Sequence, residues 1–72
     1  AYAPHNAYRC KGDDQWVTIA VTNEEEWQGL CQAMGNPEWT KDAKFADGYS
    51  RWLNQAEGTD RYREIPLWQL NQ

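Results

Sequence analysis

The feature that most limits the fold of this chain is a change of apolar period between residues 16 and 34. The segment 16–21 is rich in β-branched and aromatic residues, and every second position is a β-branched apolar residue: Val17, Ile19 and Val21. Alternation of this kind is typical of a strand with one buried face. Apolar residues then recur at helical spacing, at Trp27, Leu30, Cys31 and Met34. The sequence therefore predicts a strand followed directly by an amphipathic helix.

An earlier segment is suited to pair with this strand. Tyr8 and Cys10 would share one face of a short strand, and Arg9 and Lys11 the other. The tripeptide Gly12-Asp13-Asp14 supplies turn chemistry, because glycine accepts a positive φ and aspartate can bond its own backbone. Residues 1–6 are expected to form an extended lead-in, since Pro4 restricts the residue before it. An antiparallel hairpin is the expected result.

The predicted helix has clear ends. Thr22 or Asn23 can cap its start, the spacing from Thr22 to Glu25 matches a capping box, and three glutamates occupy the first turn. Gly35, with Pro37 just beyond it, closes the helix. We expect this helix to occupy residues 23–34 and to pack its apolar stripe on the hairpin.

Shorter helices are expected after residue 36. Helical turns are predicted at 37–39 and 42–45, and Asp47 is expected to cap a helix through Tyr49, Trp52 and Leu53. Gly58 and Pro66 disfavour long helices beyond Gln55, which leaves room for a last helix between them. The predicted fold class is α+β: an antiparallel β-hairpin packed against an amphipathic helix, followed by short helices.

Length and charge exclude several function classes. With 72 residues the chain is at most one small domain. Its formal charge is −4 and it has no Lys/Arg cluster, so neither nucleic acid nor an anionic membrane surface is an expected partner. It has no apolar run near the roughly 18 residues that would cross a bilayer. We therefore expect a cytoplasmic protein.

The two cysteines are expected to be buried free thiols. Cys10 and Cys31 do not form a disulfide framework, although a single bridge between them remains an alternative. With His5 they lack the paired spacing and the fourth ligand of a structural zinc site. We therefore expect no metal site.

Two motifs carry a family resemblance. The strands contain C-K-G-D-D-x-W-V-x-I-A-V and the helix and its loop contain W-x-x-L-C-x-A-x-G-x-P-E-W. This chain thus resembles the small domain of the class III CoA-transferases, the group that includes formyl-CoA transferase and carnitine CoA-transferase. The resemblance is dense from Tyr8 to Phe45 and continues through an R-x-x-N formed by Arg51 and Asn54. Residues 55–72 diverge from the family pattern and are candidates for poor order.

The resemblance implies a specific function for the parent enzyme. These transferases move CoA between carboxylic acids through acyl-enzyme anhydrides, with a carboxylate nucleophile in a large domain. They are several times longer than this chain, so we expect a fragment that is inactive alone. Its partners would be the remainder of the enzyme or a second subunit, with self-association as a further expectation. CoA would be a co-substrate of the family, not a ligand that the isolated chain retains.

The same resemblance assigns candidate residues. The family's loop after Cys-Lys-Gly lies near CoA, so Lys11, Gly12 and Asp13 would border that cofactor; the alternative is a solvated lysine and a plain turn. No catalytic residue is assigned. Four aspartates are expected to act only in turns and caps: Asp13, Asp14, Asp42 and Asp47.

Two other functions remain open. The five tryptophans are compatible with a small binding module for a sugar or a peptide. They are also compatible with a purely structural docking domain. If the chain is a detached transferase domain, we expect an exposed docking face around Trp39, Trp52 and Trp68, because Trp16 and Trp27 would be used in hairpin and helix packing.

Overall fold

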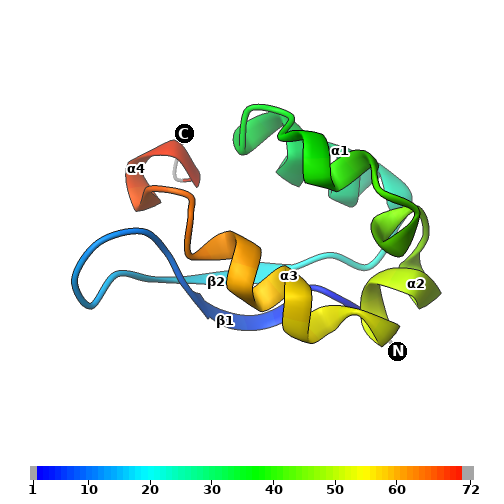
Figure 1. The fold of residues 1–72 in the computed structure, drawn as a ribbon, viewed down its shortest axis with the longest axis horizontal. Coiled ribbons are helices and arrows are strands. Elements are labelled where there is room, and N and C mark those ends of the chain that lie inside the picture. Colours follow the sequence, from blue (N-terminus) through cyan, green and yellow to red (C-terminus); the bar gives the residue numbers. More distant parts are fainter. Residues whose placement is uncertain (1, 71–72) are drawn as a thin grey trace.

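The computed structural model describes residues 2–70. Two strands, β1 (His5–Arg9) and β2 (Trp16–Ala20), precede the main helix α1 (Glu24–Ala33). Two 3-10 turns follow, η1 (Glu38–Lys41) and η2 (Ala43–Phe45), and then three short helices: α2 (Gly48–Leu53), α3 (Gln55–Tyr62) and α4 (Leu67–Leu70). Figure 1 shows the hairpin running along the length of the molecule, with α1 and α4 above it and α3 across it. The predicted α+β class is confirmed.

The strands form the expected antiparallel hairpin, with Ala7 opposite Thr18. Its turn uses positive φ angles at Gly12 (113°) and Asp14 (52°). Strand β1 begins at His5, earlier than expected, inside the segment that was predicted to be a lead-in. Pairing extends this far because the Val21 N–H donates to the Pro4 carbonyl at 2.8 Å, which holds the start of β1 against the end of β2.

Helix α1 is capped by Asn23, whose Oδ1 accepts from the Glu26 N–H at 2.8 Å. Glu26 Oε1 in turn accepts from the Thr22 N–H at 2.7 Å and from its hydroxyl at 2.7 Å. These hydrogen bonds lower the pKa of the Glu26 carboxyl. The predicted capping spacing from Thr22 to Glu25 was wrong by one residue, because the helix starts at Glu24 and its third residue is Glu26.

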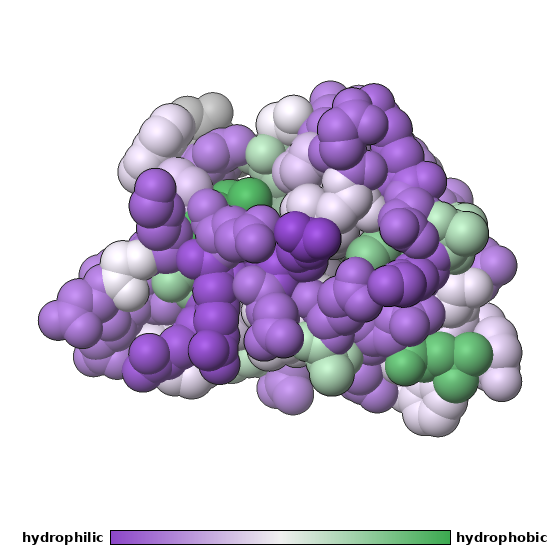
Figure 2. All heavy atoms as spheres, in the orientation of Figure 1, coloured by the Kyte–Doolittle hydropathy of each residue, from purple (hydrophilic) through white to green (hydrophobic). Residues whose placement is uncertain are grey.

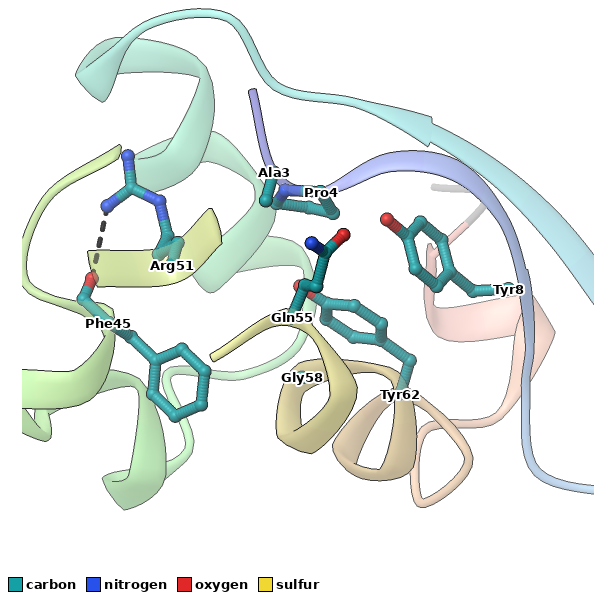
Figure 3. A pocket seen from close by; sticks show the side chains of 8 residues that line it. All are labelled: Ala3, Pro4, Tyr8, Phe45, Arg51, Gln55, Gly58 and Tyr62. Atoms are coloured by element: carbon teal, nitrogen blue, oxygen red, sulfur yellow. Dashed lines mark hydrogen bonds between the residues drawn. The ribbon is translucent and has the colours of Figure 1, made fainter. Parts of the chain in front are cut away.

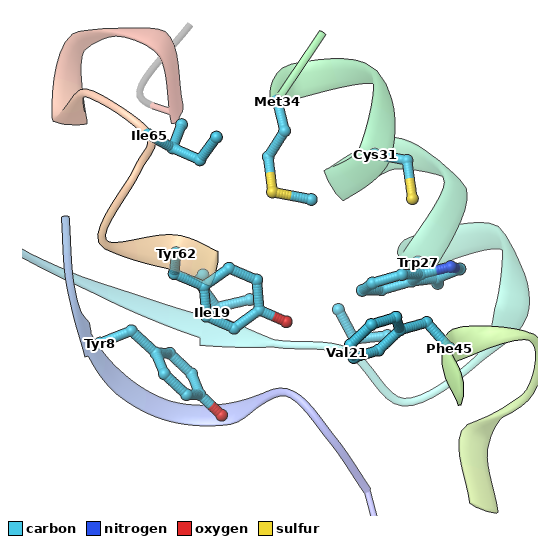
Figure 4. Packing of buried hydrophobic residues seen from close by; sticks show 9 residues of the cluster. All are labelled: Tyr8, Ile19, Val21, Trp27, Cys31, Met34, Phe45, Tyr62 and Ile65. Carbon is cyan, nitrogen blue, oxygen red and sulfur yellow. The ribbon is translucent and has the colours of Figure 1, made fainter. Parts of the chain in front are cut away.

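The core lies between the hairpin, α1 and α3, as Figure 4 shows. Trp27 and Cys31 of α1, and Met34 at its C-terminal cap, are buried as predicted, whereas Leu30 is only partly buried at the edge. The remaining core residues are Tyr8, Ile19, Val21, Phe45, Tyr62 and Ile65. Trp27 stacks on Phe45 with ring centroids 6.5 Å apart, and Tyr8 meets Tyr62 edge-on at 4.9 Å.

The last third of the described chain completes this core. The sequence predicted a last helix between Gly58 and Pro66. Helix α3 starts earlier, at Gln55, and contains Gly58. It contributes Tyr62, and the turn after it contributes Ile65. The Ile65 carbonyl accepts from the Lys11 N–H at 2.8 Å, which ties the chain near α4 to the hairpin turn.

Candidate functional site

The three candidate residues Lys11, Gly12 and Asp13 lie together on an open groove of about 660 Å³. Gln15, also on the hairpin, lines the groove on the same side. The other wall is the start of α4, at Pro66, Leu67 and Trp68. Lys11 and Pro66 pair as an isolated parallel bridge, so backbone hydrogen bonding sets the spacing of the two walls. Figure 1 shows the hairpin turn lying beside α4 at one end of the molecule.

The groove offers a cation, a close backbone approach and an aromatic face. Lys11 is exposed, and none of the ion pairs among residues 2–70 involves it. Gly12 cannot be replaced without strain, because its φ is +113° and a Cβ would lie 3.0 Å from Gln15 Cγ. The Trp68 side chain is 67% exposed. Such a groove can contact a phosphate and a flat ring, although Asp13 reduces its attraction for anions.

The other aspartates act as expected in turns and caps. Asp14 accepts from the Trp16 indole at 3.1 Å, Asp42 from the Lys44 N–H at 3.0 Å, and Asp47 from the Ser50 N–H at 2.8 Å. The Ser50 hydrogen bonds lower the pKa of Asp47. The prediction of structural roles for these three carboxylates is confirmed.

The residue whose importance the sequence did not reveal is Arg51. Its side chain is only 4% exposed; Nη1 donates to the Phe45 carbonyl at 3.0 Å and Nη2 to Glu24 at 3.1 Å. The guanidinium also lies over the Trp27 ring, 4.6 Å from its centroid. The R-x-x-N motif marks the position, but its partners lie on distant segments. We call Arg51 with Glu24, Trp27 and Phe45 the Arg51 cluster; it joins α1, η2 and α2.

The cysteines are buried thiols, as predicted, and burial raises the pKa of both Cys10 and Cys31. Within residues 2–70 no three His, Cys, Asp or Glu side chains are grouped so that they could hold a metal ion. None of the helices in this part of the chain is long and apolar enough to cross a membrane.

Two predictions about the aromatic surface were wrong. Trp16 is not used in packing: it is 50% exposed on the outer face of the hairpin, beneath the Arg9 guanidinium at 5.0 Å. Trp39 is partly buried instead, edge-on to Phe45 at 5.2 Å. The exposed apolar group on α2 is formed by Tyr49, Trp52 and Leu53, which we call the α2 surface. Figure 2 shows one strongly hydrophobic group, with neighbours of intermediate hydropathy, at the end of the molecule where α2 lies.

Comparison with known proteins now assigns the family. The sequence model of CoA-transferase family III matches residues 1–67. This chain belongs to CoA-transferase family III. The matched range includes Lys11, Gly12 and Asp13 as well as Arg51, and it ends just before Trp68. The resemblance inferred from the hairpin and helix motifs is confirmed.

Three curated relatives are similar over most of the chain. Two are from Mycobacterium tuberculosis: a probable CoA-transferase, 36% identical over 74% of this chain, and a probable fatty acyl-CoA transferase, 36% identical over 82%. The third is succinyl-CoA–D-citramalate CoA-transferase of Chloroflexus aurantiacus, 38% identical over 96%. The match covers only 7%, 14% and 16% of these relatives' own lengths. No solved structure matches the chain.

Proposed function

We propose that this chain is part of the small domain of a family III CoA-transferase that moves CoA between carboxylic acids, and that it does not catalyse transfer alone. The observation that carries the proposal is the family match over residues 1–67, combined with the small share of each relative that is covered. The turn and cap roles of Asp14, Asp42 and Asp47 agree with it, because they leave these carboxylates engaged in local hydrogen bonds.

Within the parent enzyme, we propose that the groove at Lys11, Gly12 and Asp13 borders CoA. The exposed Lys11 ammonium would contact a phosphate, and Gly12 would let the ligand approach the backbone. Asp13 would limit the affinity by repelling the same phosphate. The groove therefore contributes to CoA binding at its edge, with the remaining contacts made by the rest of the enzyme.

A chimera tests both parts of this proposal. The 69 aligned residues of the Chloroflexus aurantiacus relative would be replaced by the matching residues of this chain. We expect transfer activity in the chimera and none in the isolated chain, measured as CoA exchange and as a hydroxylamine-sensitive acyl-enzyme. Detection of that acyl-enzyme on the isolated chain would refute the proposed inactivity.

The groove is tested in the same chimera with Lys11→Gln. We expect a higher KM for the acyl-CoA with kcat unchanged, because only binding is affected. Lys41→Gln is the matched control, since Lys41 is also exposed and pairs with Glu38 at 3.4 Å. An equal effect of the two substitutions would show that Lys11 does not face the ligand.

We further propose that the α2 surface contacts the remainder of the larger enzyme or a second subunit. Tyr49 is 67% exposed and Leu53 57%, and Tyr49 stacks on Trp52 at 6.4 Å. Exposed apolar residues gathered in this way are typical of contact surfaces. In the isolated chain, we expect self-association at high concentration in sedimentation experiments, reduced by Leu53→Ser. Trp16→Ser, on the hairpin, is the control and should have no effect.

The exposed aromatic residues also suit a sugar or peptide ligand. Titration of the isolated chain tests this alternative. We expect no saturable change in tryptophan fluorescence with glycan or peptide panels. Micromolar, saturable glycan binding would favour a sugar-binding module and contradict the docking role of the α2 surface.

A further inference from the structure

A small, partly enclosed pocket lies between the start of the hairpin, α2 and α3, as Figure 3 shows. It leaves about 10 Å³ for the centre of a water molecule, and its polar lining comes from Arg51, Gln55, Tyr8 and Tyr62. A single water needs about 10–15 Å³ and two to four polar partners. The pocket therefore has the size for one water and too little room for a larger ligand.

One of the residues that line the pocket has a buried atom without a hydrogen-bond partner. Arg51 Nε is buried and has no acceptor among residues 2–70, although Nη1 and Nη2 of the same guanidinium bond Phe45 and Glu24. In Figure 3, Nε lies on the side of Arg51 that faces Ala3 and Gln55, away from the bond to Phe45. A buried donor without an acceptor is costly, and native proteins commonly satisfy such groups with internal water.

We propose that this pocket binds one structural water that accepts a hydrogen bond from Arg51 Nε–H. The water would make its other hydrogen bonds with the Gln55 side-chain amide and the Tyr62 hydroxyl, because both residues line the same pocket. It would thereby connect the Arg51 cluster to α3. An anion is disfavoured, because Glu24 already neutralises Arg51.

The same water accounts for a glycine inside a helix. Gly58 lies in α3, where glycine is unfavourable relative to alanine, yet it is buried and lines the pocket. A Cβ at this position would lie 3.6 Å from the Tyr62 hydroxyl and 3.7 Å from Phe45 Cε1, which are ordinary contacts. Alanine therefore fits sterically but takes space from the water, so the absence of a side chain preserves the site.

Oxygen-17 relaxation dispersion tests the proposal, because it counts long-lived waters and is insensitive to exchange of hydroxyl protons. We expect the wild-type chain to hold at least one such water and Gly58→Ala to hold one fewer. Gly29→Ala is the matched control: Gly29 is an exposed residue of α1, a Cβ added there would meet nothing within 4 Å, and the variant should keep the wild-type count.

A second readout needs no variant. Nuclear Overhauser spectra of the wild-type chain should show a contact between long-lived water and the Arg51 Nε proton, with the sign that separates a bound water from proton exchange. The proposal is overturned if the wild type holds no long-lived water, if this contact is absent, or if folded Gly58→Ala keeps the wild-type count. These outcomes are independent of whether the parent enzyme transfers CoA.

Discussion

Replacement of Arg51 by methionine should destabilise the chain strongly, although Arg51 is a charged residue on a short helix. The side chain is 4% exposed, donates to the Phe45 carbonyl at 3.0 Å and covers the Trp27 ring at 4.6 Å. Methionine keeps an unbranched apolar stem but supplies none of these polar contacts. The variant thus removes the Arg51 cluster with little change in packing volume.

The expected cost can be worked out contact by contact. Loss of the buried hydrogen bond to Phe45 costs about 1–3 kcal/mol, because the carbonyl loses a charged donor. The cation–π contact contributes about 1–2 kcal/mol when it is partly desolvated. The Glu24 side chain is 54% exposed, so its ion pair adds only about 0–1 kcal/mol. Methionine avoids the cost of desolvating the buried guanidinium, which offsets part of the loss and leaves about 2–4 kcal/mol.

Chemical denaturation with a matched control measures this cost. Arg61→Met is the control, because Arg61 pairs with the 57% exposed Glu64 at 3.5 Å and lies 6.0 Å from the Trp39 ring, so its loss should cost under about 1 kcal/mol. A chain of this size has a total stability of only about 4–10 kcal/mol. Arg51→Met should accordingly lower Tm by roughly 10–25 °C.

The outcome that refutes this reasoning is a free energy of unfolding for Arg51→Met within about 0.5 kcal/mol of the Arg61→Met value. It would mean that the buried contacts to Phe45 and Trp27 contribute no more than an exposed pair. High salt should leave the difference between the variants nearly unchanged, because the hydrogen bond and ring contact are shielded from solvent ions.

Two further predictions follow from burial. Met34→Ala should lower the free energy of unfolding by about 2–5 kcal/mol, because Met34 is buried in the core. Leu30→Ala should lower it by only about 1–2 kcal/mol, because Leu30 is partly buried. Equal losses for the two variants in denaturation curves would contradict this packing. Burial raises the pKa of Cys31 above 9.0 and that of Tyr62 far above 10.0. The fold therefore favours the neutral thiol and phenol, and their contribution to the free energy of unfolding is fully present below pH 9.0. It is lost at higher pH, as the thiol and then the phenol ionise in the unfolded chain. Thermal melts from pH 8 to 11 should show this fall, with a shallower slope for Tyr62→Phe above pH 10; an equal slope would contradict it.

The local pattern of the sequence predicted the hairpin and α1 because their signals lie within a few residues. Period-two alternation placed Ile19 and Val21 inside, and the helical stripe placed Trp27, Cys31 and Met34 inside. The start of β1 was missed because His5 and Asn6 are exposed, so they carry no apolar pattern. Their pairing with β2 is visible only in backbone hydrogen bonds.

The site was less predictable, because its parts meet through long-range contacts. The candidate residues Lys11, Gly12 and Asp13 were predicted from the family motif. The opposite wall of the groove, at the start of α4, is held in place by the backbone hydrogen bond from Lys11 to Ile65, which the sequence does not show. Arg51 likewise gains its role from Glu24, which is 27 residues away in the chain. The presence of a tryptophan in the sequence does not show whether its side chain is exposed. Trp16 was therefore predicted to be packed and Trp39 to be exposed, whereas Trp16 is exposed and Trp39 is partly buried.

The two proposed contact regions lie at opposite ends of the molecule. Figure 1 shows the hairpin turn and α4, which form the groove, far from α2 and the start of the hairpin. The Arg51 cluster lies at the α2 end, so substitutions there should affect stability and docking more than CoA affinity. Lys11→Gln, at the other end, should affect CoA affinity without altering stability, since Lys11 is exposed. A substitution at one end that changed both properties would require the groove and the α2 surface to act as a single contact region.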